Sequence, residues 1–381
     1  MFTNSSRLVV SAIAIASLLA SHAESFSTTS RRVAIVTGAN GYVGKAIVHE
    51  LLRLDDDETE RQEDGIICLV RDQRMQDETK YWQNEQSVKV MPYDMLDGCK
   101  TLDEALKCAY ETDDATTCCI YHVASVFGPT DDHKQTALDN VQGTEDVIRC
   151  AARYAPNVKV VVTSSMAAVR ATDQTPKNGQ FYTHEDWNTK SALGKNWGQS
   201  YQWSKAESER RAWELSKELG VDMVSLCPSF VFGPPVKGST SKSYSITLVG
   251  QWIKGESEVQ SRLCVDVRDA ALAHVRAGRR AEANGKRYIL SSEARLSSVD
   301  VGVVLRKIAT ETGLGDPESI VCDTNFDGGA IKIGDKEVEA TERLAAELGV
   351  TRDTQLSRHA EEVLWNCFFG MNVAMEIILT S

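Results

Sequence analysis

The chain has 381 residues, of which 42% are hydrophobic and 25% charged, so it is long enough for a large core or two lobes. Its formal net charge of -12 argues against nucleic acid or an anionic membrane surface as a partner. The ten cysteines contain no C-x-x-C pair and the seven histidines show no ligand spacing, so the sequence predicts no metal site. What remains is an ordinary globular protein.

The first 31 residues have the features of a targeting leader. Residues 8–20 are apolar, follow Arg7, and are too few to span a bilayer comfortably. Small residues at Ser21 and Ala23 predict cleavage of a secretory signal over about residues 1–23. Residues 24–31 are hydroxyl-rich and basic and resemble the transit part of the bipartite leader of algae with complex plastids. We expect entry into the secretory pathway, with the plastid, the endoplasmic reticulum or the cell exterior as destination, and no stable membrane span after the leader is removed.

A glycine-rich turn follows the first apolar run, at residues 33–37, and precedes a segment with helical apolar spacing. Glycine at Gly38 and Gly41 lets the backbone turn tightly and approach a pyrophosphate, and Gly44 lets helix and strand pack closely. The helix N-terminus offers N–H groups and partial positive charge to phosphates. The alternative is a tight connection with no ligand. The predicted dinucleotide contacts are Gly38, Asn40, Gly41, Tyr42, Val43 and Gly44.

The residue after the second apolar run indicates which dinucleotide is bound. A carboxylate there would bond the ribose 2′-hydroxyl of NAD, whereas an arginine accommodates the 2′-phosphate of NADP. Here the run at 66–70 is followed by Arg71, with Arg74 as a second contact. The alternative is a plain surface arginine, with Asp72 turned inward instead. We expect NADP(H) to be preferred and NAD(H) to remain usable.

Apolar and amphipathic segments alternate along the chain, which predicts a doubly wound parallel sheet with helices on both faces. Ligands bind such sheets at the carboxyl ends of the strands, where Gly38, Arg71, Ala124 and Ser165 fall. The predicted strands lie near 33–37, 66–70, 88–92, 118–123, 158–163 and 222–227, and the predicted helices near 42–54, 101–110, 133–154 and 199–219.

A tyrosine and a lysine four residues apart, Tyr201 and Lys205, lie on one of these helices and share a face. A nearby ammonium favours phenolate over phenol and makes the tyrosine usable in proton transfer. By itself the pair is more typical of a solvated edge of an amphipathic helix. The serines Ser164 and Ser165, which end a Val-rich strand upstream, turn it into a candidate hydride-transfer site.

In these features the chain from about residue 32 resembles the extended short-chain dehydrogenase/reductase superfamily, the NAD-dependent epimerase/dehydratase family, and most resembles its dihydroflavonol, cinnamoyl-CoA and aldehyde reductases. The spacing of the glycines in the turn is G-x-x-G-x-x-G, which is the pattern of that superfamily, and not G-x-G-x-x-G. The matching stretches are residues 36–44, 69–72, 121–125, 140–144, 162–165, 201–205, 227–228, 233–234 and 265–269.

The resemblance implies a role for each matching residue. Ser165, or alternatively Ser164, would bond the substrate carbonyl oxygen, Tyr201 would protonate it, and Lys205 would hold the nicotinamide ribose and lower the pKa of the phenol. Asn140 would lie near the active site, or be a capping or surface amide. Asp94 would contact adenine, or only start a loop. Further cofactor contacts would be Met95, Val123, Ala124, Ser125, Tyr201, Lys205 and Pro228.

The alternation breaks after Pro228, where the resemblance implies that a substrate lobe begins. We expect a Rossmann domain over residues 32–228 and 265–292, interleaved with a smaller substrate lobe over 229–264 and 293–381. Phe181, Trp187 and Trp197 would line an apolar pocket or pack as the core of a lid. The apolar tail at 365–379 would be a packed helix or an oligomer contact, and a homodimer is compatible with it.

The expected function is an NADPH-dependent reductase or dehydrogenase that acts on a small-molecule carbonyl or alcohol. One alternative is a nucleotide-sugar epimerase or dehydratase that retains its NAD. Two features disfavour it: Arg71 follows the second apolar run, and Met166, which is not an acidic residue, follows the two serines. Another is a sensor that binds dinucleotide without chemistry, although both Tyr201 and Lys205 are present.

Overall fold

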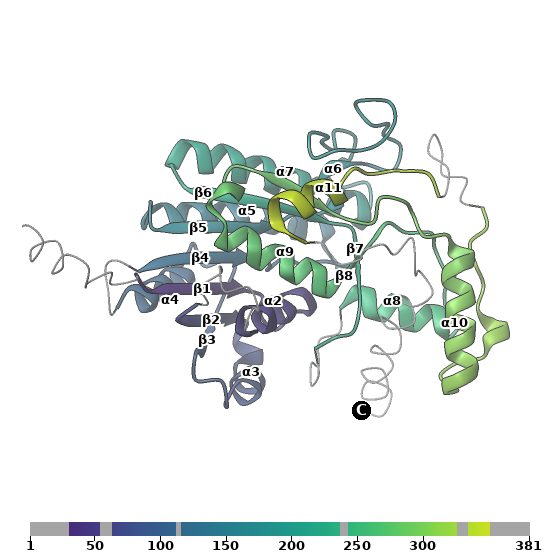
Figure 1. Cartoon of the computed structure of the whole chain (residues 1–381), viewed down its shortest axis with the longest axis horizontal. Helices are drawn as coiled ribbons and strands as arrows, with labels where there is room; N and C mark the ends of the chain where they lie inside the picture. The colour runs from purple at the N-terminus through teal and green to yellow at the C-terminus, as the bar shows by residue number, and fades with distance from the viewer. Residues whose placement is uncertain (1–29, 54–62, 112–115, 237–242, 326–333, 351–381) are drawn as a thin grey trace, which may run out of the picture.

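The computed structural model describes residues 30–53, 63–111, 116–236, 243–325 and 334–350. The tail predicted at 365–379 and almost all of the predicted leader lie outside these residues. Seven parallel strands form one sheet in the order β3-β2-β1-β4-β5-β6-β9 (Figure 1). The strands are β1 (Arg32–Thr37), β2 (Gly65–Val70), β3 (Val88–Pro92), β4 (Thr117–His122), β5 (Val158–Thr163), β6 (Asp222–Pro228) and β9 (Arg287–Leu290).

Side chains of the strands alternate between two cores, one on each face of the sheet. Val33 and Ile35 of β1 belong to one core, and Ala34 and Val36 belong to the other. All four are buried, which is why the run reads as continuously apolar in the sequence. The doubly wound parallel fold class predicted from the sequence is therefore confirmed.

Helices cover both faces (Figure 1). Helices α5 and α7 pack against each other, and both contribute to the core that contains Ile35. Helices α2 and α9 pack together and contribute to the other core. The helices are α2 (Tyr42–Leu52), α3 (Met75–Tyr81), α4 (Lys100–Tyr110), α5 (His133–Ala152), α6 (Met166–Val169), α7 (Trp197–Leu219), α8 (Tyr244–Ile253), α9 (Val267–Arg279), α10 (Ser298–Thr312) and α11 (Thr341–Arg343). The short 3-10 or π elements are η1 (Asp72–Arg74), η2 (Ala281–Ala283), η3 (Pro317–Ser319) and η4 (Leu344–Leu348).

The chain after β6 builds a second, smaller unit at one end of the sheet. Strands β7 (Phe230–Phe232) and β8 (Cys264–Asp266) form a separate parallel pair, and α8 and α10 lie beyond them (Figure 1). The strand β8 does not join the main sheet, but α9 (Val267–Arg279), which follows it, packs against β4, β5 and β6. The Asp266 carboxylate accepts a hydrogen bond from the Arg268 N–H, so it ends β8 and caps α9. Only β9 returns to the main sheet.

The turn between β1 and α2 depends on close backbone contact. Gly38 has a positive φ of 66° and lies against Ala124 at the end of β4. A Cβ on Gly44 would lie 2.2 Å from the Gly38 carbonyl oxygen, so no larger residue fits there without moving the turn. The amide of Gly41 donates to that same oxygen at 2.9 Å. Glycine at position 44 is therefore required by packing alone.

We expect Gly44→Ala to lower the free energy of unfolding by about 1–3 kcal/mol, because the added methyl group overpacks the turn. The matched control is Gly198→Ala on α7, where the new Cβ would meet its nearest atom at 3.5 Å. That control should be neutral or stabilising by about 0.5–1 kcal/mol, since alanine is the better helix former. Urea unfolding followed by circular dichroism measures both, and equal midpoints would contradict the packing argument.

Candidate active site

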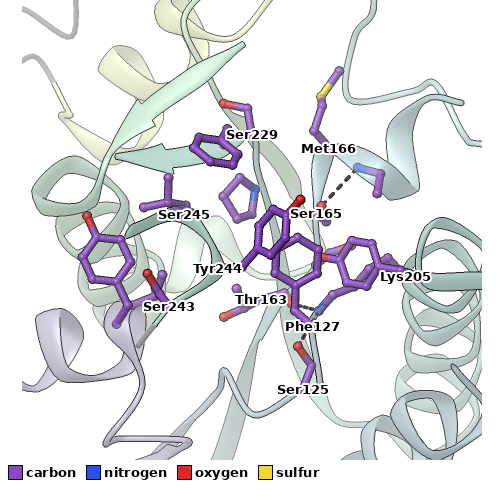
Figure 2. Close-up of a pocket in the computed structure, with 18 of the residues that line it drawn as sticks. Ser125, Phe127, Thr163, Ser165, Met166, Lys205, Ser229, Ser243, Tyr244 and Ser245 are labelled. Carbon is purple, nitrogen blue, oxygen red and sulfur yellow. Dashed lines mark hydrogen bonds between the residues drawn. The ribbon is translucent and has the colours of Figure 1, made fainter. Parts of the chain in front are cut away.

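A cavity of about 570 Å³ lies where the strand ends of the main sheet meet the substrate lobe. Gly38 follows β1, Ser125 follows β4, Ser165 follows β5, and Pro228 ends β6; all four line the cavity. Tyr244 and Ser245 of α8 and Phe230 of β7 supply the opposite wall (Figure 2). The cavity therefore lies outside the carboxyl ends of the parallel strands, where the strand order reverses between β1 and β4, which is the crevice where doubly wound sheets bind ligands.

The glycine turn forms one end of the cavity and fits a dinucleotide. Gly38, Gly41, Tyr42, Val43 and Gly44 all line it. The start of α2 at Gly41 has no side-chain cap, so the first N–H groups of the helix are available for phosphate oxygens. The Tyr42 hydroxyl donates to the Gly233 carbonyl at 2.5 Å and joins α2 to the chain after β7.

Arg71 also lines the cavity, exposed at the start of η1. Asp72, which could have turned inward, is exposed within η1. The guanidinium of Arg74 is 52% exposed, lies 3.8 Å from Asp77 and does not reach the cavity. Arg74 is therefore outside the lining of the cavity, and the second phosphate contact expected of it stays a prediction.

Tyr201 and Lys205 face the cavity from α7, one helical turn apart. The Lys205 ammonium donates to the Ser125 hydroxyl at 3.3 Å and to the Thr163 carbonyl at 3.1 Å, as Figure 2 shows. Burial lowers the pKa of Lys205 to about 8. Burial also raises the pKa of Tyr201 to about 12, and a hydrogen bond with Ser165 only partly offsets this rise. Desolvation therefore dominates the pKa of the phenol, and the lowering expected from Lys205 stays a prediction.

The two adjacent serines have different environments. The Ser164 hydroxyl is buried and donates to the Glu209 carboxylate at 2.7 Å. Ser165 caps α6, where its oxygen accepts from the Ala167 N–H at 3.1 Å, and it is the serine that interacts with Tyr201. A hydroxyl committed to a buried carboxylate is not free for a substrate. The geometry therefore favours Ser165 over Ser164 as the substrate-facing serine.

The carboxylate of Glu209 is the centre of a fully buried network that sequence reasoning missed. Arg287 of β9 pairs with it in a bidentate manner, at 2.7 and 2.9 Å. Ser225 of β6 donates to it at 2.6 Å. Glu209 stands four residues after Lys205, so the helical spacing that revealed the Tyr201 and Lys205 pair would also have revealed it. The network joins α7 to the residue that follows β5, to the middle of β6 and to the start of β9.

A second buried network begins at Thr37, which sequence reasoning also missed. The Thr37 hydroxyl oxygen accepts from the N–H groups of Val123 and Ala124, both at 3.1 Å, and lies 3.1 Å from His122 Nδ1. Since both lone pairs are used, its proton must go to Nδ1, which leaves the proton of the ring on Nε2. His122 Nε2 then donates to Thr144 at 3.2 Å. Burial lowers the pKa of His122 to about 3, in keeping with a neutral ring.

Asn140 is neither a capping nor a surface amide, which were the alternatives to a place near the site. It is 4% exposed on α5, its amide donates to the Val126 carbonyl at 3.0 Å, and its carbonyl accepts from the Val126 N–H at 2.8 Å. These two hydrogen bonds fix the backbone at Val126, between Ser125, which contacts Lys205, and Phe127. Asn140 acts in this structure as a positioning residue.

Four predicted cofactor contacts do not line the main cavity: Asn40, Asp94, Met95 and Ala124. Ala124 packs against Gly38 and supports the turn from behind. Asp94 is exposed and accepts from the Leu96 N–H at 2.9 Å, so its carboxylate organises a loop. Met95 fills the space beside Gly143 of α5. Ala124, Asp94 and Met95 thus have local packing or turn contacts, and the four cofactor contacts stay predictions.

The aromatic wall of the cavity differs from the expected one. Phe127 contacts Tyr201 with ring centroids 4.4 Å apart and Tyr244 at 4.9 Å, and Trp197 packs behind them. Of the expected aromatics, Trp187 instead lies 3.9 Å from the Arg287 guanidinium, and Phe181 contacts Lys336. Phe127 and Tyr244 lie in loop-flanked positions without apolar periodicity, so the sequence pattern carries little signal for them.

Known proteins match this chain along most of its length. The model of the NAD dependent epimerase/dehydratase family matches residues 34–290, the stretch that contains the glycine turn, Ser165, Tyr201 and β9. The chain belongs to this family. Membership confirms the predicted family and makes the chain an NAD(P)-dependent enzyme.

Individual relatives agree with the family match. Cinnamoyl-CoA reductase 2 of Arabidopsis thaliana is 31% identical over 284 residues, which cover 74% of this chain and 78% of the relative. Cinnamoyl-CoA reductase 1 of the same plant is 35% identical over 195 residues, 50% of this chain and 53% of the relative. The crystal structure of yeast methylglyoxal/isovaleraldehyde reductase Gre2 with NADPH superposes with a TM-score of 0.70 at 22% identity, covering 89% of this chain and 98% of Gre2.

The family member described here shows neither a metal cluster nor a spanning helix in its described parts. Within the described ranges, no three His, Cys, Asp or Glu side chains gather in a way that could hold a metal ion. A search of the same ranges finds no helix with the length and apolar character needed to cross a membrane.

We expect Glu209→Ala to lower the free energy of unfolding by about 3–5 kcal/mol, because it leaves the Arg287 guanidinium buried without its counter-charge. The control is Glu214→Ala on the same helix, where the side chain is 60% exposed and pairs only with Arg211. The control should stay within about 0.5 kcal/mol of the parent. Chemical unfolding of both variants measures the difference, and similar losses in the two would show that the buried pair is not a major support.

Proposed function

We propose that this family member is an NADPH-dependent reductase that transfers hydride to the carbonyl group of an aldehyde, a ketone or a dihydroflavonol-like substrate, with Tyr201 as the proton donor. The observation that carries the proposal is that Ser165, Tyr201 and Lys205 line one cavity together with the glycine turn. The similarity to cinnamoyl-CoA reductases and to Gre2, whose crystal structure holds NADPH, supports the same reaction class.

The residues of the cavity provide the donors that carbonyl reduction requires. When bound, the nicotinamide supplies the hydride, and negative charge then develops on the carbonyl oxygen. Ser165 and Tyr201 are the hydroxyl donors positioned for that oxygen. The pKa of Tyr201, near 12, keeps the phenol protonated at neutral pH, which suits a proton donor in the direction of reduction.

Lys205 is assigned to the cofactor rather than to direct control of the phenol. Its ammonium has three N–H donors, and the bonds to Ser125 and to the Thr163 carbonyl use two of them. The third is available for a ribose hydroxyl in the same cavity. Asn140 supports this geometry because it holds the Val126 backbone next to Ser125.

We expect Tyr201→Phe to lower kcat for NADPH-dependent aldehyde reduction by about 10²–10⁴-fold, the typical contribution of a positioned proton donor. Binding of NADPH should be nearly unchanged, since the ring and its packing against Phe127 are retained. NADPH oxidation followed by absorbance, on a panel of aldehydes, diketones and dihydroflavonols, measures the first effect, and fluorescence titration measures the second.

The control for this substitution is Tyr110→Phe. Tyr110 lies at the end of α4, where its hydroxyl donates to the Asn157 carbonyl outside the cavity. It should keep the parent kcat. Equal turnover in Tyr201→Phe and the parent would contradict the assignment of the proton donor, and absence of turnover in the parent on every carbonyl would favour a dinucleotide-binding sensor.

We expect Arg71→Ala to reduce the preference for NADPH over NADH by about tenfold or more, since a guanidinium bond to a phosphate is charge-assisted. The ratio of kcat/KM for the two cofactors is the measurement. Arg53→Ala, at the far end of α2 with a side chain 49% exposed, serves as control and should leave the ratio unchanged. An unchanged ratio in Arg71→Ala, or tightly bound NAD in the purified protein, would instead support the epimerase or dehydratase alternative.

A further inference from the structure

The lobe side of the cavity contains an excess of positive charge. Arg170, Arg262 and Arg295 all line this side, away from the glycine turn. Arg170 follows α6, and the other two lie on segments that pair through a bridge between Arg262 and Leu296. Glu337 is the carboxylate that contacts this group. Among the described residues, the Glu337 carboxylate thus contacts Arg170 and Arg295 but not Arg262, beside the reacting groups Ser165 and Tyr201.

Arg295 takes most of the charge compensation that Glu337 offers. The two side chains form a bidentate pair with both distances at 2.9 Å, and both are at least nine-tenths buried. Arg170 Nε lies 3.4 Å from the same carboxylate without forming a hydrogen bond, and this buried nitrogen has no hydrogen-bond partner among the described residues. Arg170 is therefore only partly compensated.

Arg262 lacks a carboxylate partner altogether among the described residues. Its guanidinium lies 5.3 Å from the ring centroid of Phe230 and donates to the neutral side chain of Gln260. The Nε of Arg262 is buried and has no hydrogen-bond partner among the described residues. The same holds for the hydroxyl of Ser229, which lines the same wall. A buried donor without an acceptor costs about 1–3 kcal/mol, and more when it is charged.

Burial and the neighbouring arginines both disfavour the charged form of these side chains. Burial lowers the pKa of Arg262, Tyr244 and Cys264 partly oppose this shift, and the Arg295 cation adds to it. Burial also lowers the pKa of Arg170, and Arg295 and Arg262 oppose the favourable effect of Glu337 there. An anion between Arg170 and Arg262 would accept the unpaired N–H groups and balance the excess charge.

We propose that the substrate carries an anionic group, a carboxylate or a phosphate, which Arg262 and Arg170 bind while Ser165 and Tyr201 hold the carbonyl oxygen. This deepens the proposed reductase function and rests on it for the role of the carbonyl. The phosphates of the dinucleotide are assigned to the glycine turn and to Arg71, which follow β1 and β2, so they do not account for the arginines of the lobe side. The ring of Tyr244 and that of Phe127 would contact the apolar part of the substrate.

The test compares aldehydes that differ in charge but little in shape. 4-Carboxybenzaldehyde and 4-formylphenyl phosphate are the anionic probes, and methyl 4-formylbenzoate is the neutral one, assayed with NADPH in a buffer without phosphate or carboxylate ions. We expect kcat/KM for at least one anionic probe to exceed that for the ester by about tenfold or more, which corresponds to one charge-assisted contact. The probe that is preferred tells carboxylate from phosphate.

Substitutions then assign the preference to the arginines. Arg262→Gln should remove most of the preference for the anionic probe and change kcat/KM for the ester by less than about threefold, whereas Arg262→Lys should retain part of it. Arg149→Gln on α5, with a side chain 46% exposed, is the control and should keep the full preference. Thermal melting identifies any variant that fails to fold, in which case Arg170→Gln replaces it.

A binding measurement separates this proposal from the proposed function. Terephthalate has two carboxylates and no reducible carbonyl, so calorimetric titration detects the anion site without turnover. Binding that Arg262→Gln weakens supports the site even if no aldehyde is reduced, and in that case only the reductase assignment fails. Equal kcat/KM for charged and neutral probes in the parent, or binding of terephthalate that neither Arg262→Gln nor Arg170→Gln weakens, would overturn the proposal.

Discussion

The buried pair between Glu209 and Arg287 is the interaction on which the rest of the site depends. Glu209 belongs to the helix that carries Tyr201 and Lys205, and Arg287 begins the last strand of the sheet. Through Ser164 and Ser225 the same carboxylate reaches two further strands. A single ionised group thereby sets the depth and rotation of the catalytic helix relative to the strand ends. A charge so deeply buried is tolerated because each of its oxygens accepts several hydrogen bonds.

The remaining polar groups under the cavity follow the same logic. The bonds of Thr37, His122 and Thr144 form a chain in which each donor meets an acceptor, and they fix the backbone of Val123 and Ala124 against the glycine turn. Asn140 fixes the next segment, at Val126. Together they keep rigid the floor on which a dinucleotide would rest, so little ordering of the protein is left for the moment of binding.

The parallel sheet and the glycine turn could be predicted from the sequence because each follows a simple local pattern. Apolar runs mark the predicted strands, and the glycine spacing marks the turn, since both reflect local requirements of the backbone. The lobe was harder, because its strand β8 has only three residues and its last residue, Asp266, already caps the next helix. The partners of Glu209 and of Arg262 could not be foreseen, because they are 78 residues apart in the first case and depend on lobe packing in the second. The burial that raises the pKa of Tyr201 could not be foreseen either, because desolvation is a property of the packed site and not of residue spacing.

The separate pairing of β7 with β8 has a practical consequence. These two strands exchange no ladder bonds with the main sheet, and with α8 they form the wall that faces the reacting groups. Under the proposed function, substrate selectivity and chemistry would therefore depend on different hydrogen-bonded units. A library that varies residues of this wall, such as Phe230, Tyr244 and Ser245, leaves the ladder and the buried carboxylate untouched, so directed evolution toward new carbonyl compounds has a natural boundary within which to work.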